Sequence, residues 1–144
     1  GGIATGQQLA AALALGADGV QIGSRFAISI ESSGHPGFKQ AVVDAGPADT
    51  KLVLKAHVPV RLLKNAFRDR ITDLEAAGAG REELAAALGQ GRARRGMLEG
   101  DLAEGELEIG QVSGLIEDIP TVREIMDRLL AGYDETVKKF NPTH

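Results

Sequence analysis

Two glycine-containing bends near the start of the sequence carry residue types that bind phosphate through the backbone. The first is Gly1-Gly2 and the second is Gly23-Ser24. Because glycine has no Cβ, a ligand can approach its backbone closely, and successive N–H groups form a concave site for anions. Such amides, together with one hydroxyl, can satisfy a doubly charged phosphate without a lysine. The plainer interpretation is a pair of tight turns that bind no ligand.

The residues between the bends predict the helix that would bring them together. Thr5 followed by Gln8 is a capping box, and Gly16 suits the left-handed position after a helix. The short apolar run 20–22 then predicts a strand that ends at the second bend. A strand, a helix and a strand within about 25 residues form a βαβ unit with parallel strands. We therefore expect both bends at the carboxyl ends of neighbouring strands, where (β/α)8 barrels often bind cofactor phosphates.

Composition and length exclude several classes of function. The chain has 144 residues, no cysteine and a net charge of −4, which argues against disulfides, cysteine nucleophiles and a nucleic-acid-binding surface. No apolar run reaches the ~18 residues of a membrane-spanning helix, so the cytoplasm is the expected compartment. A complete (β/α)8 barrel needs about 200 residues or more. Because the sequence also opens on a strand end without its strand, we expect the C-terminal part of a longer chain.

The remaining side chains offer little chemistry of their own. The histidines at positions 35, 57 and 144 have no partner at metal-ligand spacing, and no residue near His35 in sequence would orient it as a base. The chain contains no P-loop and no G-x-S-x-G nucleophile motif. This pattern predicts no metal site, and it favours a cofactor that brings its own reactivity.

The run GGIATGQQLAAALALGADGVQIGSRF, residues 1–26, resembles the nitronate monooxygenase family, formerly called 2-nitropropane dioxygenases. The FMN-dependent enoyl-acyl-carrier-protein reductases belong to the same group. The resemblance extends to ESSGHPGFKQAV at 31–42 and to ARRGMLEGDLAEGELEIGQVSGLI at 93–116. The glycine core alone is shared with inosine monophosphate dehydrogenase and related phosphate-binding barrels. The two later motifs disfavour that dehydrogenase alternative.

The resemblance implies an α/β fold, namely the C-terminal part of a (β/α)8 TIM barrel (its last two strands) with an appended, mainly helical lobe. It implies FMN as the cofactor. Carried over position by position, the residues that hold its phosphate are Gly2, Gln21, Ile22, Gly23 and Ser24. The family's catalytic base is a histidine from an earlier strand that this sequence does not contain. We therefore assign no catalytic residue and expect this part of the enzyme alone to be inactive.

Three functions remain open at this stage. The leading one is FMN-dependent oxidation of alkyl nitronates, and the second is an enoyl-acyl-carrier-protein reductase that uses NAD(P)H. The third is a non-catalytic module that binds a phosphate ligand or a partner. The enzyme interpretations predict a small-molecule substrate, nitronate or enoyl thioester, without nucleic acid or membrane. Exposed sheet edges of a partial barrel also favour a homodimer.

The pattern divides the chain into three expected parts. Residues 1–50 would form the final βαβ unit with the phosphate site, and 51–116 a helical, glycine-rich lobe. Residues 117–144 would contain a C-terminal helix that docks on the barrel. Within these parts, periodicity predicts helices over 38–45, 60–77, 81–88 and 120–140, and an extended segment over 51–56.

Several residues outside the bends have expected structural roles. Arg61 and Asn65, in a run that resembles the family, are expected to hold the lobe together, whereas the other basic residues of the 60–77 helix should be solvated. Gly132 should weaken the last helix. Residues 89–114, rich in glycine, predict a lid or a binding loop. Within this segment Gln111 should hold a turn, with ligand contact as the alternative. The tail at 141–144 should be frayed.

Overall fold

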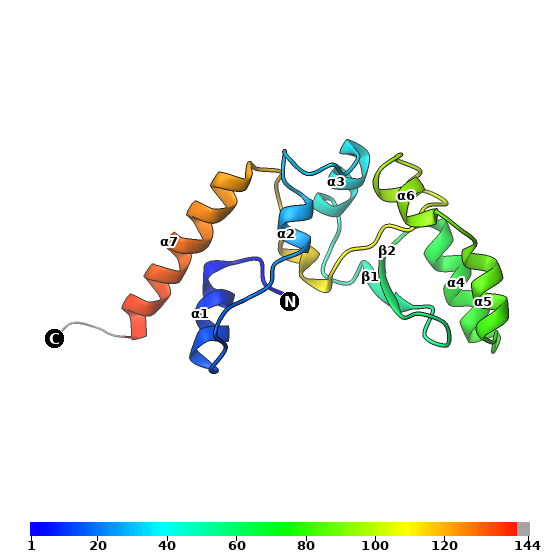
Figure 1. Cartoon of the computed structure of the whole chain (residues 1–144), viewed down its shortest axis with the longest axis horizontal. Coiled ribbons are helices and arrows are strands. Elements are labelled where there is room, and N and C mark those ends of the chain that lie inside the picture. Colours follow the sequence, from blue (N-terminus) through cyan, green and yellow to red (C-terminus); the bar gives the residue numbers. More distant parts are fainter. Residues whose placement is uncertain (141–144) are drawn as a thin grey trace.

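The computed structural model describes residues 1–140 as a row of small packed units (Figure 1). Helices α1 and α7 lie at one end, and the β-hairpin with α4 and α5 lies at the other. Between them are α2, α3 and the 3₁₀ helix η1. The elements are α1 Gly6–Ala14, α2 Ser24–Ala27, α3 Pro36–Val43, β1 Thr50–Val53, β2 Val60–Leu63, α4 Ala66–Ala76, α5 Arg81–Leu88, α6 Arg92–Met97, η1 Gln111–Leu115 and α7 Val122–Phe140. The predicted frayed tail, 141–144, lies outside the described residues.

Helix α1 begins as the sequence predicts. The Thr5 hydroxyl accepts a hydrogen bond from the Gln8 N–H, and the Gln8 side chain accepts from the Thr5 N–H, which completes the capping box. The helix packs against α7, where Gly6 meets Gly132. A Cβ placed on Gly6 would lie 2.3 Å from the Tyr133 backbone nitrogen. Gly132 is therefore a contact point between two helices, and its expected effect of weakening α7 is offset by that packing.

The parallel strands expected on either side of α1 do not form a sheet. Within residues 1–140 the sheet is the antiparallel pair of β1 and β2, and both 1–4 and 20–22 have no strand partner. The prediction of a closed βαβ unit is therefore wrong for this structure. The reason is physical: a strand is defined by hydrogen bonds to a neighbour, which local sequence does not supply.

The middle of the molecule is built around one apolar cluster. It joins α2, α3 and β2 to the chain that precedes and follows η1, and its buried members are Ile28, Phe38, Val42, Leu63, Leu107, Ile109 and Ile116. Helix α3 begins two residues earlier than predicted because His35 caps it: Nδ1 of His35 accepts from the Gly37 N–H at 3.0 Å.

The lobe at the far end has its own core and a hairpin that the sequence did not predict in full. The extended segment predicted at 51–56 is confirmed over 51–53, in β1, whereas 54–56 belong to the turn that follows. Residues 60–63 pair with β1 as β2, with Val53 opposite Val60. The predicted helix over 60–77 therefore starts only at Ala66, where the Asn65 side chain accepts from the Arg68 N–H. Helices α4 and α5 cover the hairpin, and the buried residues are Val53, Leu54, Leu62, Phe67, Ile71 and Leu84.

The roles predicted for Arg61 and Asn65 are confirmed. Arg61 donates to the carbonyl and hydroxyl of Thr50 across the hairpin, and Asn65 donates to the carbonyls of Leu102 and Gly105. Arg68, expected in solvent, is instead buried and donates to the Asp49 carbonyl. Its position on the helix brings it over the turn before β1, which the sequence alone did not place there.

The glycine-rich segment 89–114 is packed rather than free. It contains α6, and Gly96 lies so close to the Glu106 carbonyl that a Cβ would be 2.3 Å from its oxygen. The Leu63 N–H donates to Leu107 and the Ile109 N–H donates to Arg61, so this chain runs along β2. The lid prediction is wrong for most of the segment because its apolar residues fill the central core. Its end, which forms most of η1, borders the cavity beside Gly2.

Candidate functional site

The first bend presents bare backbone beside a cavity. Gly2 is exposed and has φ of +76°, a conformation that glycine adopts without strain, and no atom lies within 4 Å of the position where a Cβ would stand. It borders a cavity of about 360 Å³ whose opposite wall comes from η1, including Gln111 and Val112. Gln8 and Pro47 complete the rim. The backbone of this bend is therefore open to a ligand.

The second bend, taken with the two preceding residues that the resemblance implies (21–24), is open in the same way. Gln21 and Gly23 are exposed, Ile22 and Ser24 are half-buried, and again nothing lies within 4 Å of a Cβ built on Gly23. The Ser24 hydroxyl accepts a hydrogen bond of 2.9 Å from the Gly110 N–H. The chain that leads into η1 therefore contacts the second bend at Gly110 and borders the first at Gln111.

The N–H groups of both bends remain available. Within residues 1–140, the backbone amides of Gly2, Gln21, Ile22, Gly23 and Ser24 donate no hydrogen bond to the protein. An open N–H without a protein acceptor is the donor that a phosphate oxygen needs. These five amides and the Ser24 hydroxyl are therefore donors of the kind that suits the phosphate of the cofactor that the sequence motif implies.

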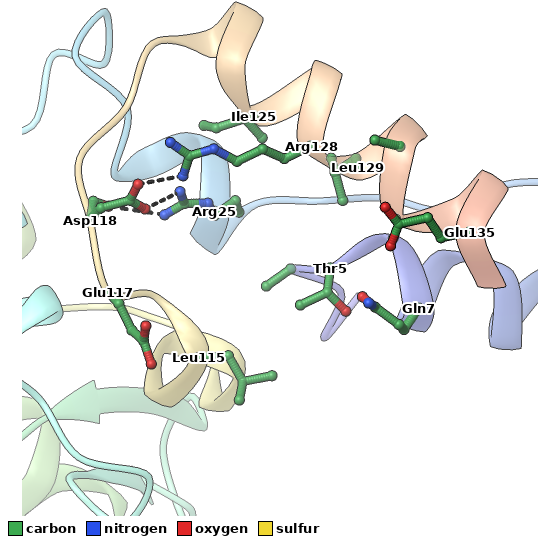
Figure 2. Close-up of a pocket in the computed structure, with 14 residues that line it drawn as sticks. Thr5, Gln7, Arg25, Leu115, Glu117, Asp118, Ile125, Arg128, Leu129 and Glu135 are labelled. Atoms are coloured by element: carbon green, nitrogen blue, oxygen red, sulfur yellow. Dashed lines mark hydrogen bonds and ion pairs between the residues drawn. The ribbon is translucent and has the colours of Figure 1, made fainter.

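An ion-pair cluster that sequence analysis missed lies beside the second bend (Figure 2). Arg25, buried next to Ser24, donates to the carbonyl of Asp118 at 3.0 Å and to its carboxylate at 2.5 Å. Arg128 of α7 binds the same carboxylate. The cluster fixes α2 to the chain before α7, and it borders a cavity of about 600 Å³ between α1, α7 and Leu115. No sequence motif links positions 25, 118 and 128, so only the fold could reveal it.

The two arginines determine the ionisation of Asp118. Partial burial acts to raise the pKa of this carboxyl, but the hydrogen bonds from Arg128 and Arg25 outweigh it and hold the pKa below its ordinary value. The carboxylate is therefore charged wherever the protein is folded near neutral pH. Asp118 therefore offsets part of the positive charge of both arginines.

A buried lysine that the sequence did not single out holds the chain after α2. The ammonium of Lys39 donates to the carbonyls of Ser29, Ile30 and Ser32, at 2.7, 3.2 and 2.8 Å. Its three N–H donors are therefore all satisfied by backbone. Lys39 is a structural cross-link below the second bend, since nothing remains of it to contact a ligand.

Metal and histidine chemistry find no support in the described chain. Residues 1–140 contain no group of three or more acidic, histidine or cysteine side chains placed to hold a metal ion. His35 serves as the cap of α3 and packs against Gly100, where a Cβ would lie 2.5 Å from the imidazole ring. The expectation that His35 is not a catalytic base stays consistent with this capping role.

Comparison with known proteins decides the family. The sequence profile described as nitronate monooxygenase matches residues 1–132, which include both bends and η1. The chain belongs to the nitronate monooxygenase family. This family comprises FMN-dependent oxidoreductases, so the resemblance drawn from the motifs is confirmed.

Relatives with curated descriptions match over different lengths. A probable nitronate monooxygenase of Bacillus subtilis is 54% identical over 52 residues, which cover 36% of this chain and 15% of the relative. A (3aS,4S,5R,7aS)-5-hydroxy-7a-methyl-1-oxo-octahydro-1H-indene-4-carboxyl-CoA dehydrogenase of Rhodococcus jostii is 29% identical over 171 residues, which cover 91% of this chain and 48% of the relative. The chain therefore spans less than half the length of these two relatives.

Solved structures agree with the family. FabK from Thermotoga maritima superposes with a TM-score of 0.90 at 39% identity, covering 98% of this chain and 45% of FabK. Nitroalkane oxidase from Streptomyces ansochromogenes gives a TM-score of 0.76 at 27% identity, covering 97% of this chain and 40% of that protein. The chain is thus a mixed α/β unit that corresponds to a part of each structure. Within residues 1–140, no helix combines the length and the apolar character needed to cross a bilayer.

Proposed function

We propose that this chain is the flavin-phosphate-binding, C-terminal part of a (β/α)8 enzyme that oxidises alkyl nitronates with FMN. One observation carries the proposal: the family match includes two bends whose backbone N–H groups are exposed and have no acceptor within residues 1–140. FMN-dependent members of the family rely on a cofactor that brings its own reactivity, and this chain would supply part of its binding site. When bound, FMN supplies the electron-transfer chemistry.

The residues of this chain would bind and orient the cofactor. Amides of Gly2, Ile22, Gly23 and Ser24 would donate to phosphate oxygens, and the Ser24 hydroxyl would add a further donor. The exposed Gln21 side chain would donate to the phosphate or to the ribityl chain. Hydrogen bonds from neutral donors to a charged acceptor are stronger than those between neutral groups, each contributing about 1.5–3 kcal/mol.

A thioester substrate is the second candidate, in the form of an enoyl-acyl-carrier-protein reductase that uses NAD(P)H. The specific observation in its favour is the Rhodococcus relative, whose name describes a carboxyl-CoA compound and which matches 91% of this chain. Sequence identity is also higher to FabK than to nitroalkane oxidase, 39% against 27%, so identity to these structures does not favour the nitronate reaction over the reductase reaction. The residues that contact substrate would come from the part of the enzyme beyond this chain.

The visible absorption spectrum of the complete protein, purified and reconstituted with FMN, tests the proposal. Flavin bands that remain after gel filtration are the expected result. A protein that stays colourless would reject the flavoenzyme and favour a non-catalytic binding module. Turnover with an alkyl nitronate under oxygen, compared with turnover of a crotonyl thioester with NADH, then separates the two reactions.

A further inference from the structure

The Ser24 side chain links the second bend to the start of η1. Its Oγ accepts the Gly110 N–H at 2.9 Å, a contact between residues 86 positions apart in the chain. A hydroxyl has one proton to donate besides its acceptor pairs. Within residues 1–140, Ser24 Oγ donates no hydrogen bond, so its proton is available to a ligand at the bend.

Gly110 is a glycine because of this contact. Its φ of −71° is one that any residue can adopt, so backbone conformation does not require glycine here. A Cβ at this position would lie 2.7 Å from Ser24 Oγ, and the next atom, Ser24 Cβ, is 3.9 Å away. The space that a side chain would need is therefore filled by the Ser24 hydroxyl and not by backbone.

The Gly110 contact also determines where one wall of the Gly2 cavity stands. Gly110 is the residue immediately before η1, and Gln111 and Val112 at the start of η1 border the cavity beside Gly2. Gln111 is exposed, and its side chain makes no hydrogen bond within residues 1–140. A shift of Gly110 would therefore move the Gln111 amide relative to a ligand held at the first bend.

We infer that Ser24 is a positioning residue that couples phosphate binding to the placement of 110–115 against the ligand, an inference that rests on the proposed function. The hydroxyl donates to a phosphate oxygen while it accepts the Gly110 N–H. A hydroxyl that donates to an anion becomes a better acceptor, so each bond strengthens the other. Because coupling between two sites is reciprocal, correct placement of 110–115 tightens phosphate binding by the same factor. Gln111 is then held at the wall of the cavity beside Gly2.

Amide hydrogen exchange of the complete protein over 107–116, measured without ligand, with FMN and with riboflavin, tests the coupling. Riboflavin lacks the phosphate and serves as the matched ligand. FMN is expected to slow exchange over 110–115 more than saturating riboflavin does. Ser24→Ala removes the hydroxyl, and Gly110→Ala displaces it while leaving it in the protein. Each should speed ligand-free exchange there by about 2- to 10-fold, the range for one neutral hydrogen bond, and abolish the extra effect of FMN.

Binding titrations of the same proteins provide the second readout. Ser24→Ala should weaken FMN binding by about 10-fold or more, Gly110→Ala should weaken it several-fold, and Ser24→Thr should restore it because the hydroxyl is kept. Ser24→Ala combined with Gln111→Ala should lose less than the product of the single losses. Gly19→Ala, where a Cβ meets no atom within 4 Å, is the control. Ser24→Ala removes the hydroxyl, whereas Gly110→Ala displaces it. If one of these variants misfolds, the other still tests the coupling.

The outcomes separate the two proposals. If Ser24→Ala weakens FMN binding but exchange over 110–115 and binding by Gly110→Ala match the Gly19→Ala control, Ser24 is a phosphate ligand only and the coupling is overturned. If the unaltered protein takes up FMN but riboflavin protects 110–115 equally, the coupling is also overturned. If the unaltered protein takes up no FMN, the proposed function fails and the inference fails with it.

Discussion

The hairpin lobe and the first 27 residues differ in what they do with their side chains and backbone. In the lobe, 50–88, six apolar side chains of the hairpin, α4 and α5, Phe67 among them, are almost fully buried. In the first 27 residues, the bends at Gly2 and at 21–24 leave backbone N–H groups open and exposed. One region obtains its stability from excluded water, and the other keeps hydrogen-bond donors ready for a ligand.

The two bends have no apolar core of their own, so contacts with neighbouring elements must keep their backbone in place. The helices that follow the bends provide these contacts. Helix α1 packs against α7, and α2 is held by the Arg25–Asp118–Arg128 cluster and by the Lys39 cross-link to the residues after it. Exposed N–H groups cost little because water can hydrogen-bond them. The lobe and the bends should therefore respond to different mutations, the first in unfolding and the second in binding.

The largest effect is expected in the lobe, from Phe67→Ala. Removing a fully buried aromatic ring leaves a cavity that costs about 3–5 kcal/mol, and the Arg92 guanidinium, 4.4 Å from the ring centre, loses its stacking partner. Urea unfolding of the complete protein measures the loss. Val58→Ala, at a site that is 60% exposed, is the control and should change stability by less than about 0.5 kcal/mol. FMN affinity, measured at urea concentrations below those that unfold the protein, should be unchanged. A loss of affinity that matches the loss of stability would show that the lobe and the bends are not energetically independent.

The next largest effect should come from Gly6→Ala at the crossing of α1 and α7. In an open helix this change stabilises by about 1 kcal/mol, but here the new Cβ would meet backbone atoms, Tyr133 N at 2.3 Å and Leu129 O at 2.4 Å. Backbone cannot rotate away, so we expect a net loss of about 1–3 kcal/mol. Thermal unfolding checks the sign, with Gly19→Ala as the reference. A higher melting temperature for Gly6→Ala would show that the helices separate without cost.

A smaller and different effect is expected from Gly2→Ala. The φ of +76° at this bend is strained for alanine by roughly 1 kcal/mol, although no atom obstructs its Cβ. The bend should relax and turn its N–H away, which lowers FMN affinity by about 5-fold with little change in unfolding. Titration followed by flavin fluorescence measures the affinity. A loss of stability without a loss of FMN affinity would contradict the view that this bend serves binding rather than folding.

The smallest effect concerns pH and the Asp118 carboxyl. Burial acts to raise its pKa, but Arg128 and Arg25 lower it below the ordinary 3.8. A depressed pKa stabilises the folded state fully above the unfolded-state value, and this contribution disappears as the pH falls through the folded value. Asp118→Asn should therefore lower the melting temperature at pH 7 by a small amount, and the difference from the unaltered protein should shrink as the pH falls below 3.8. Because Asp118 is substantially exposed, with 43% of its side chain accessible, the effect should stay below about 1 kcal/mol. A pH-independent difference would mean that the ion pairs contribute nothing.

The candidate site was predictable from sequence where chemistry is local. The capping box of Thr5 and Gln8, the helix it starts, and the bare backbone at the two glycine bends all follow from residues within a few positions of one another. The family motifs added the cofactor and were confirmed as to family. The assignment of FMN phosphate to the bends stays a prediction.

Errors arose where a segment's structure depends on a distant partner. Residues 60–63 have apolar spacing that continues into α4, yet they pair with β1 as a hairpin. They do so because the backbone N–H and C=O groups of β1 need hydrogen-bond partners. Residues 89–114 have the glycines of a mobile loop, yet Gly96 and Gly105 are there to let two segments approach closely. Neither outcome can be read from local periodicity.

The family, the capped helix α1 and the positions of the two glycine bends could be predicted from the amino-acid sequence, because they depend on side chains and glycines adjacent in the chain. The residues that hold the bends in place became visible in the folded chain: Ser24 with Gly110, Arg25 with Asp118 and Arg128, and Gly6 with Gly132. The physical reason is that hydrogen bonds, ion pairs and close backbone contacts act over a few ångströms in space. These partners are some 10 to 130 positions apart in the chain, so only folding brings them within that range.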